Sequence, residues 1–236
     1  ADQVDMVNRR LEWMAASALS TGTVTIAGEG FPTTLIDFGR SASLTLALSG
    51  SSVWGSTLNS DGRDTNITGQ LTAWAARVLK ASGAQTVDIV FTNTPWQRFL
   101  GAEGVQGAIY FPNNATSGNN VNPGTMVEKG AVFMGKWGQF NLYLYNDWYI
   151  DPDTNIEQPM VADGTIIMSG PDLKGTRAFG MIMDPKFNYR PMAYAPKTWI
   201  VDDPAQRIIM MQSAPLVIPS RVNASIAITV CAPASY

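Results

Sequence analysis

The carboxylates have the most scope for chemistry in this sequence, because its 236 residues include no histidine. Without imidazole, a Ser-His-Asp triad and most zinc or iron sites are excluded. The adjacent Asp202 and Asp203 could act as an acid and a base in hydrolysis. An Asp-Asp-Pro sequence before a β-like run is ordinary turn chemistry, however, so we favour a turn over an enzyme. The sequence therefore predicts no catalytic residue.

A second group of carboxylates imitates a metal site. Asp151, Asp153 and Asn155 have the spacing of the first ligands of a calcium-binding loop. That loop needs glycine at its sixth position and glutamate at its twelfth, where this sequence has Ile156 and Ala162. Because both defining positions fail, we expect a solvated turn and no metal.

The sequence gives no better support for a dinucleotide-binding motif. Gly28 and Gly30 match the first two glycines of a dinucleotide-binding fingerprint. The third position is Thr33, and Pro32 lies inside the motif. The match is too poor to predict a cofactor.

Aromatic residues offer a different chemistry, the stacking of a sugar or a base. Five of them fall close together in the sequence: Trp137, Tyr143, Tyr145, Trp148 and Tyr149. Aromatic residues are enriched in β-strands, so packing against a neighbouring element is the favoured interpretation. A carbohydrate-binding or host-adhesion module that uses this group is the alternative.

Charge and cysteine content limit the classes of partner. The chain has 16 Lys and Arg against 19 Asp and Glu, a net charge of −3, so no overall positive field attracts nucleic acid. The single Cys231 cannot form an internal disulfide, and we expect it to pack as a small apolar residue. No apolar run is long enough to span a membrane, because the run from Arg207 to Arg221 is broken by Pro215 and Pro219.

The elements that must position these residues are predicted to be helical first and mainly β later. Apolar residues at helical spacing predict a helix over Val4–Thr21, ended by Gly22. Two short strands around a turn follow in Thr23–Arg40, and residues 41–69 are rich in turn formers, with Trp54 as the only large anchor. A second helix is predicted over 70–83, with an apolar face formed by Leu71, Trp74, Ala75, Val78 and Leu79.

The rest of the chain is predicted to form a strand, a short helix, a loop and then many strands. A buried strand ends at Phe91, and Thr94 and Pro95 are expected to be the N-cap and first residue of the short helix. The polar run Asn113–Gly124 predicts a long exposed loop, followed by an alternating strand at Phe140–Tyr145. Five further β-like runs between residues 164 and 230 then favour the α+β class.

Several short motifs follow one another in the order of a known family. "PKTW" (196–199), "DDPA" (202–205) and "MMQSAPL" (210–216) resemble the C-terminal part of tailed-phage major capsid proteins. The group is that of the bacteriophage lambda major head protein, the phage major capsid protein E family. The block Met14–Arg40, with its "GE" and D-x-G-R elements, and "RAFG" at 177–180 resemble the same family.

This resemblance implies the HK97-like phage capsid fold. It assigns 1–64 to a peripheral domain, 65–163 mainly to an axial domain, and 164–236 to a return to the peripheral sheet. The helix Val4–Thr21 would be the end of the spine helix, with the run Arg207–Pro219 as a strand packed beneath it. The apolar residues of that run would be core, the prolines would mark an edge or bulge, and the loop Asn113–Gly124 would lie at the axial tip.

The function implied is that of a major capsid (head) subunit rather than an enzyme. Copies of the chain would form hexamers and pentamers of an icosahedral shell around packaged DNA, contacted only non-specifically, with scaffold, portal and decoration proteins as further partners. The protein would be prophage-encoded, assembled in the bacterial host cytoplasm and located in the virion. Another phage structural protein, of the decoration or tail type, is the nearest alternative.

The family pattern also has an N-terminal arm and an extended loop before the spine helix, and neither precedes the first helix of this sequence. We therefore expect an N-terminally truncated chain that is a monomer or small oligomer in solution.

Overall fold

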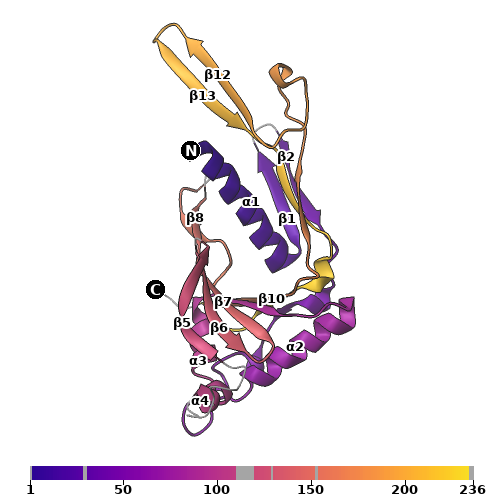
Figure 1. Ribbon diagram of the computed structural model, residues 1–236, viewed down its shortest axis with the longest axis vertical. Helices are drawn as coiled ribbons and strands as arrows, with labels where there is room; N and C mark the ends of the chain where they lie inside the picture. Colours follow the sequence, from indigo (N-terminus) through magenta and orange to yellow (C-terminus); the bar gives the residue numbers. More distant parts are fainter. Residues whose placement is uncertain (1, 29–30, 110–119, 129, 152–153, 234–236) are drawn as a thin grey trace.

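The computed structural model describes residues 2–28, 31–109, 120–128, 130–151 and 154–233. The molecule is elongated (Figure 1), with helices and a large sheet at one end and a two-stranded hairpin at the other. Helix α1 lies between these ends, along the long axis. The described part combines a few helices with a mixed sheet, which confirms the predicted α+β class.

Helix α1 spans Asp2–Thr21, so it ends where its apolar spacing predicts and begins two residues earlier than predicted. Its buried stripe includes Leu11, Met14 and Ala18. The helix ends at Gly22, which has φ +78° and donates its N–H to the carbonyl of Ala18 at 3.0 Å. The predicted hairpin follows, with β1 (Thr23–Gly28) antiparallel to β2 (Phe31–Asp37).

The central sheet has seven strands in the order β3-β15-β10-β4-β7-β6-β5. Two of its pairings are parallel, β3 with β15 and β4 with β7, and the others are antiparallel. The strands are β3 (Thr45–Ala47), β4 (Asp88–Phe91), β5 (Asn120–Glu128), β6 (Ala131–Trp137), β7 (Phe140–Tyr145), β10 (Thr165–Ser169) and β15 (Ile226–Thr229). The N-terminal, middle and C-terminal parts of the chain therefore share one sheet.

Helix α2 (Ile67–Ser82) packs against this sheet through Leu71, Trp74 and Val78, as predicted. Leu79 is the exception, since 48% of its surface is exposed, and its assignment to the buried face was wrong. The buried Trp54 stacks on Trp74, with ring centroids 6.2 Å apart, which confirms its role as an anchor.

Helix α3 (Asn93–Leu100) begins earlier than predicted, and helix α4 (Glu103–Ile109) follows it closely. Thr92, in an extended conformation, occupies the N-cap position, so the assignment of Thr94 as N-cap and Pro95 as the first helical residue was wrong by two positions. The carboxylate of Asp163 receives the Thr94 N–H at 3.0 Å. An acceptor so distant in sequence left no local signal for the true helix start.

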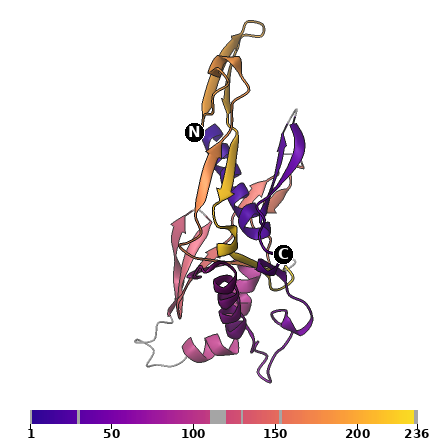
Figure 2. The same cartoon turned by 90° about the vertical axis from the view of Figure 1, so that its right-hand side faces the viewer.

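The remaining strands form two-stranded sheets: β8 (Trp148–Ile150) with β9 (Glu157–Pro159), β11 (Gly175–Phe179) with β14 (Pro215–Pro219), and β12 (Ala195–Val201) with β13 (Gln206–Gln212). The 3-10 turns are η1 (Ala42–Leu44), η2 (Gly50–Ser52), η4 (Pro185–Phe187) and η5 (Val222–Ala224). The β12–β13 hairpin forms one end of the molecule in both views (Figure 2).

The apolar run Arg207–Pro219 is therefore two strands, and the prediction of one buried strand was wrong for its first half. In β13, 59% of the surface of Ile209 is exposed, because β12 and β13 form a two-stranded sheet that extends beyond the rest of the molecule (Figure 1). The second half, β14, packs against α1 as expected. Pro215 and Pro219 lie at the two ends of this strand in a two-stranded sheet, which confirms the predicted edge position.

The predicted loop Asn113–Gly124 is corrected at its C-terminal end. Residues 120–124 already belong to β5, while 113–119 lie outside the described residues. Asparagine and glycine in this stretch predict a turn, but the pairing of β5 with β6 decides the conformation.

Candidate functional site

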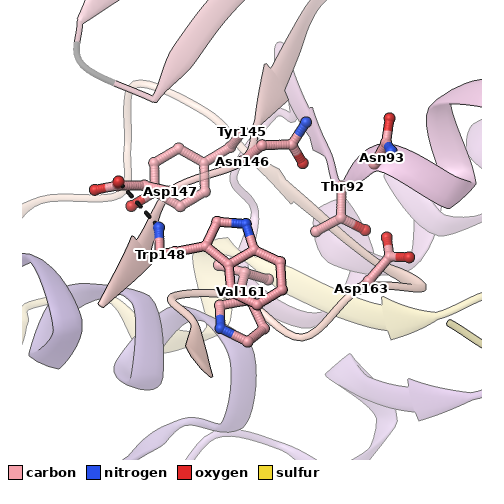
Figure 3. A pocket seen from close by; sticks show the side chains of 9 residues that line it. Thr92, Asn93, Tyr145, Asn146, Asp147, Trp148, Val161 and Asp163 are labelled. Atoms are coloured by element: carbon pink, nitrogen blue, oxygen red, sulfur yellow. Dashed lines mark hydrogen bonds between the residues drawn. The ribbon is translucent and has the colours of Figure 1, made fainter. Parts of the chain in front are cut away.

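A pocket of about 230 Å³ lies where α3, β7 and β8 meet (Figure 3). It is lined by Thr92, Asn93, Tyr145, Asn146, Asp147, Trp148, Pro159, Val161 and Asp163. Figure 3 shows the carboxylates of Asp147 and Asp163 on opposite sides of the pocket, with Trp148 between them. Each of these carboxylates is held by contacts of its own within the fold.

Asp163 is used to hold two elements together. Its carboxylate accepts the N–H of Thr94 at 3.0 Å and the hydroxyl of the same residue at 2.5 Å, at the start of α3. Burial alone would raise the pKa of Asp163, but the hydrogen bonds from Thr94, Gly164 and Thr92 together outweigh it and lower the pKa. The nearby hydroxyl of Thr92 donates to the carbonyl of Thr165 at 2.9 Å and accepts the N–H of Gly164 at 3.1 Å. These polar groups join α3 to the strand β10.

Asp147 joins α1 to the opposite side of the pocket. It forms an ion pair with Arg9 at 3.0 Å and accepts the backbone N–H of Trp148 at 3.0 Å. The hydroxyl of Tyr145 donates to the carboxylate of Glu12 at 2.7 Å. Burial and this hydrogen bond raise the pKa of Tyr145, so the phenol stays protonated at neutral pH. The titratable groups of this region thus attach the long helix to the sheet.

The adjacent Asp202 and Asp203 form part of a turn, as expected, whereas Asp153 of the second carboxylate group lies outside the described residues. Asp202 and Asp203 lie in the exposed turn between β12 and β13. At the second site, Asp151 accepts the hydroxyl of Thr154 at 2.8 Å, and Asn155 donates its N–H to the carbonyl of Asp151 at 2.8 Å. Among the described residues, no group of three or more acidic or cysteine side chains is placed to hold a metal ion.

The five aromatic residues do not form one platform. The ring of Trp137 packs on Phe99 at the edge of the main core, and Tyr143 packs on Phe133 in the neighbouring strand. Tyr145, Trp148 and Tyr149 gather on another part of the molecule, beside α1. The structure thus divides this group among three places, and the interpretation as packing accounts for most of it.

An open groove of about 600 Å³ lies between α1 and the β8–β9 hairpin. Its lining combines Met6, Arg9, Arg10 and Trp13 of α1 with Trp148, Tyr149, Ile150 and Glu157. Arg10 lies over the ring of Trp13, 4.3 Å from the centroid. Trp148 is 49% exposed here.

Arg40 is a structural residue whose role was not predicted, although it ends the D-x-G-R element. Its guanidinium donates to the carbonyls of Leu19 at 2.5 Å and Ser20 at 2.6 Å, at the C-terminus of α1. It also donates to the hydroxyl of Thr45 at 2.9 Å, at the start of β3. Burial lowers the pKa of Arg40 to about 10, so the side chain remains a cation at neutral pH. Arg40 therefore caps the long helix and joins it to the central sheet.

The buried polar groups described above are committed to holding elements together, while large apolar side chains are exposed at the end formed by the β12–β13 hairpin. The fold that carries these features is of the α+β class. A family model described as phage major capsid protein E matches residues 1–230. The chain belongs to this family.

Curated relatives and solved structures agree with this assignment. The chain is 28% identical over 214 residues to the major capsid proteins of Escherichia phage N15 and Escherichia phage lambda. Each match covers 88% of this chain and 59% of the relative, so the chain spans about three-fifths of the length of these proteins.

None of the described helices is long and apolar enough to cross a bilayer.

The fold is also that of a solved protein described as a prophage capsid protein from Escherichia coli CFT073. The TM-score is 0.81 at 20% sequence identity, over 98% of this chain and 65% of the other. A phage-related protein from Bordetella bronchiseptica RB50 is more distant, with a TM-score of 0.51 at 9% identity. These two likenesses concern the fold.

Proposed function

We propose that this chain is the body of a major capsid subunit that assembles with copies of itself into hexamers and pentamers of an icosahedral phage head. The observation that carries the proposal is the family match over residues 1–230, together with the fold shared with a prophage capsid protein over 98% of the chain. The shell would enclose DNA without sequence-specific contacts. The proposed location is the virion, after assembly in the host cytoplasm from a prophage gene.

The elongated shape supports an HK97-like arrangement. In this proposal, α1 is the spine helix of a peripheral domain, and the sheet with α2, α3 and α4 is the axial domain. The segments 1–64, 65–163 and 164–236 then correspond mainly to peripheral, axial and peripheral parts. We assign β3, β10 and β15 to the axial domain, because they pair within its sheet.

Self-assembly is consistent with the surface of the chain. Monomeric proteins rarely expose large contiguous apolar patches, and such patches mark interaction sites. Here exposed apolar side chains recur along α1, β8 and the β12–β13 hairpin: Met6, Trp148, Ile150, Ile200 and Ile209. Many modest contacts of this kind, repeated by symmetry, stabilise a shell. Scaffold, portal and decoration proteins are the further partners proposed.

The test is negative-stain electron microscopy of cells that express the chain within its complete reading frame, with the neighbouring head genes supplied. Closed particles of uniform diameter are the expected result. A matched control is Gly170→Ala, because a Cβ at this glycine would lie 1.9 Å from the backbone carbonyl oxygen of Gln85 and disrupt the sheet. Soluble, folded wild-type protein without particles would contradict the proposal.

A further inference from the structure

The free end of the β12–β13 hairpin is an exposed surface with a distinct chemical character. We call residues 200–209 the hairpin tip. In this tip, 73% of the surface of Ile200 and 59% of that of Ile209 are exposed. Asp202 and Asp203 lie in the turn, also exposed. With Arg207 as its only cation, the tip carries a net charge of −1.

A second exposed surface lies at the same end of the molecule, in the segment before β12 (Figure 1). We call residues 180–192 the methionine loop. Met181 is 50% exposed, Met183 64% and Tyr189 50%. Lys186 and Arg190 of this loop are exposed as well. Apolar and basic side chains are therefore mixed on its surface.

Local hydrogen bonds give the methionine loop a defined shape. The N–H of Ile182 donates to the carbonyl of Arg190 at 3.1 Å, and the N–H of Arg190 donates to the carbonyl of Phe187 at 3.2 Å. Asn188 and Tyr189 have φ of +52° and +53°, a conformation that is uncommon for a bulky residue such as tyrosine. The loop thus presents its side chains from a folded backbone.

The charges of the two surfaces are complementary. In the loop, the carboxylate of Asp184 is already paired with Lys197 of β12. With Lys186 and Arg190 against this one carboxylate, the loop carries a net charge of +1. Within the described residues, neither cation forms an ion pair, and neither do Asp202 and Asp203 of the tip.

From this complementarity we infer that the hairpin tip of one copy docks against the methionine loop of a second copy, an inference that rests on the proposed self-assembly. Ile200 and Ile209 would contact the methionines and Tyr189, while Asp202 and Asp203 face the basic side chains. The contact joins two different surfaces, so it is heterologous and closes only through rotational symmetry.

The choice of methionine suits such a contact in a shell. Methionine is unbranched and polarizable, and it packs against partners of differing shape. Subunits of hexamers and pentamers meet at non-identical angles, so a methionine-rich acceptor keeps its apolar contact in each setting. Nucleic acid fits less well as an occupant, because the acidic tip at the same end of the molecule repels phosphate.

Charge reversal tests the docking in the full-length protein. The tip variant carries Asp202→Lys and Asp203→Lys, and the loop variant carries Lys186→Asp and Arg190→Asp. We expect each variant to lose at least about tenfold in particle number, since like charges then face each other at the contact. The variant with all four substitutions should regain particles, because its surfaces are complementary again. Asp61→Lys, an exposed carboxylate outside both surfaces, is the control and should assemble normally.

The outcomes separate this inference from the proposed function. Normal assembly of wild type and of both reversal variants would overturn the docking and leave the capsid role intact. Loss of assembly in the four-substitution variant, with an unchanged circular-dichroism spectrum and melting temperature, would also count against docking. Absence of shells from wild type itself would contradict the proposed function. The cross-linking experiment below would then test the contact between the hairpin tip and the methionine loop independently of shell formation.

For cross-linking, Asp203→Cys is combined with Tyr189→Cys. Cys231 is buried and reacts poorly, because burial raises the pKa of its thiol to about 11. Mild oxidation should give disulfide-linked dimers and larger species from the double-cysteine protein, and much less from either single-cysteine protein. Monomer alone after oxidation would overturn the docking.

Discussion

Removal of the Arg40 side chain should destabilise the protein through the C-terminus of α1. The last carbonyls of a helix have no partner within the helix, and Arg40 serves those of Leu19 and Ser20. Hydrogen bonds from a charged donor contribute about 1.5–3 kcal/mol each. The net loss is smaller than the sum of two such hydrogen bonds, because burial of the Arg40 cation costs free energy in the wild type and water can serve the carbonyls in the variant. The expected loss for Arg40→Ala is then about 2 kcal/mol.

Thermal unfolding followed by tryptophan fluorescence measures this loss. For a chain of this size, about 2 kcal/mol corresponds to a fall in Tm of about 4–8 °C. Arg40→Lys should lose roughly half as much, since an ammonium group lacks the planar fork that serves two carbonyls. Arg77→Ala is the matched control, because Arg77 makes one long hydrogen bond of 3.5 Å from an exposed site. The capping argument is refuted if Arg40→Ala melts within about 1 °C of wild type, or if the control falls equally.

Four further substitutions test other parts of the structure. Tyr145→Phe removes the hydrogen bond to Glu12 and should cost about 1 kcal/mol in urea unfolding, with the helical content unchanged. Asp163 has a lowered pKa in the folded protein, so its contribution to stability is complete above the unfolded carboxyl pKa of about 3.9 and is lost as pH falls through the lower folded value. Asp163→Asn should therefore lower Tm at neutral pH and flatten its acid dependence, and an unchanged acid dependence would contradict this role. Gly170→Ala should prevent folding because its Cβ would overlap backbone, whereas Gly69→Ala meets open space in α2 and should raise stability by about 0.5–1 kcal/mol.

The local part of the fold could be predicted from the sequence because its signals are local. Helical spacing in α1 and α2 and the glycines that follow each helix placed both elements. The hairpin β1–β2 and the strand β7 followed from β-branched residues and alternation. In each case the pattern and the buried face agree.

Strand pairing could not be predicted in the same way. The three-residue β3 (Thr45–Ala47) lies in a stretch rich in turn formers, and its partner β15 is about 180 residues later. Such a short strand is specified by its partner rather than by its own composition. The early start of α3, fixed by Asp163, is a second example of a distant contact that decides local structure.

The exposure of the surfaces proposed for assembly could not be predicted from the sequence, for a related reason. Ile209 lies in an apolar run, and apolar content alone does not distinguish a core strand from one that awaits a partner. The D-x-G-R element resembles a family feature, but the cap that Arg40 provides depends on two carbonyls about 20 residues earlier in the chain. The exposure of Ile209 and the hydrogen bonds of Arg40 both depend on the three-dimensional arrangement of distant segments, which a local sequence pattern does not contain.

The position of β15 also has a consequence for how the chain is made. This strand, Ile226–Thr229, lies between β3 and β10 and is the bridge through which β3 joins the sheet. Strand β3 is synthesised about 180 residues before β15, so it waits without its neighbour while those residues are made. Completion of the sheet therefore awaits the synthesis of β15. A nascent chain that has not yet reached β15 lacks this bridge, and its sheet stops at β10.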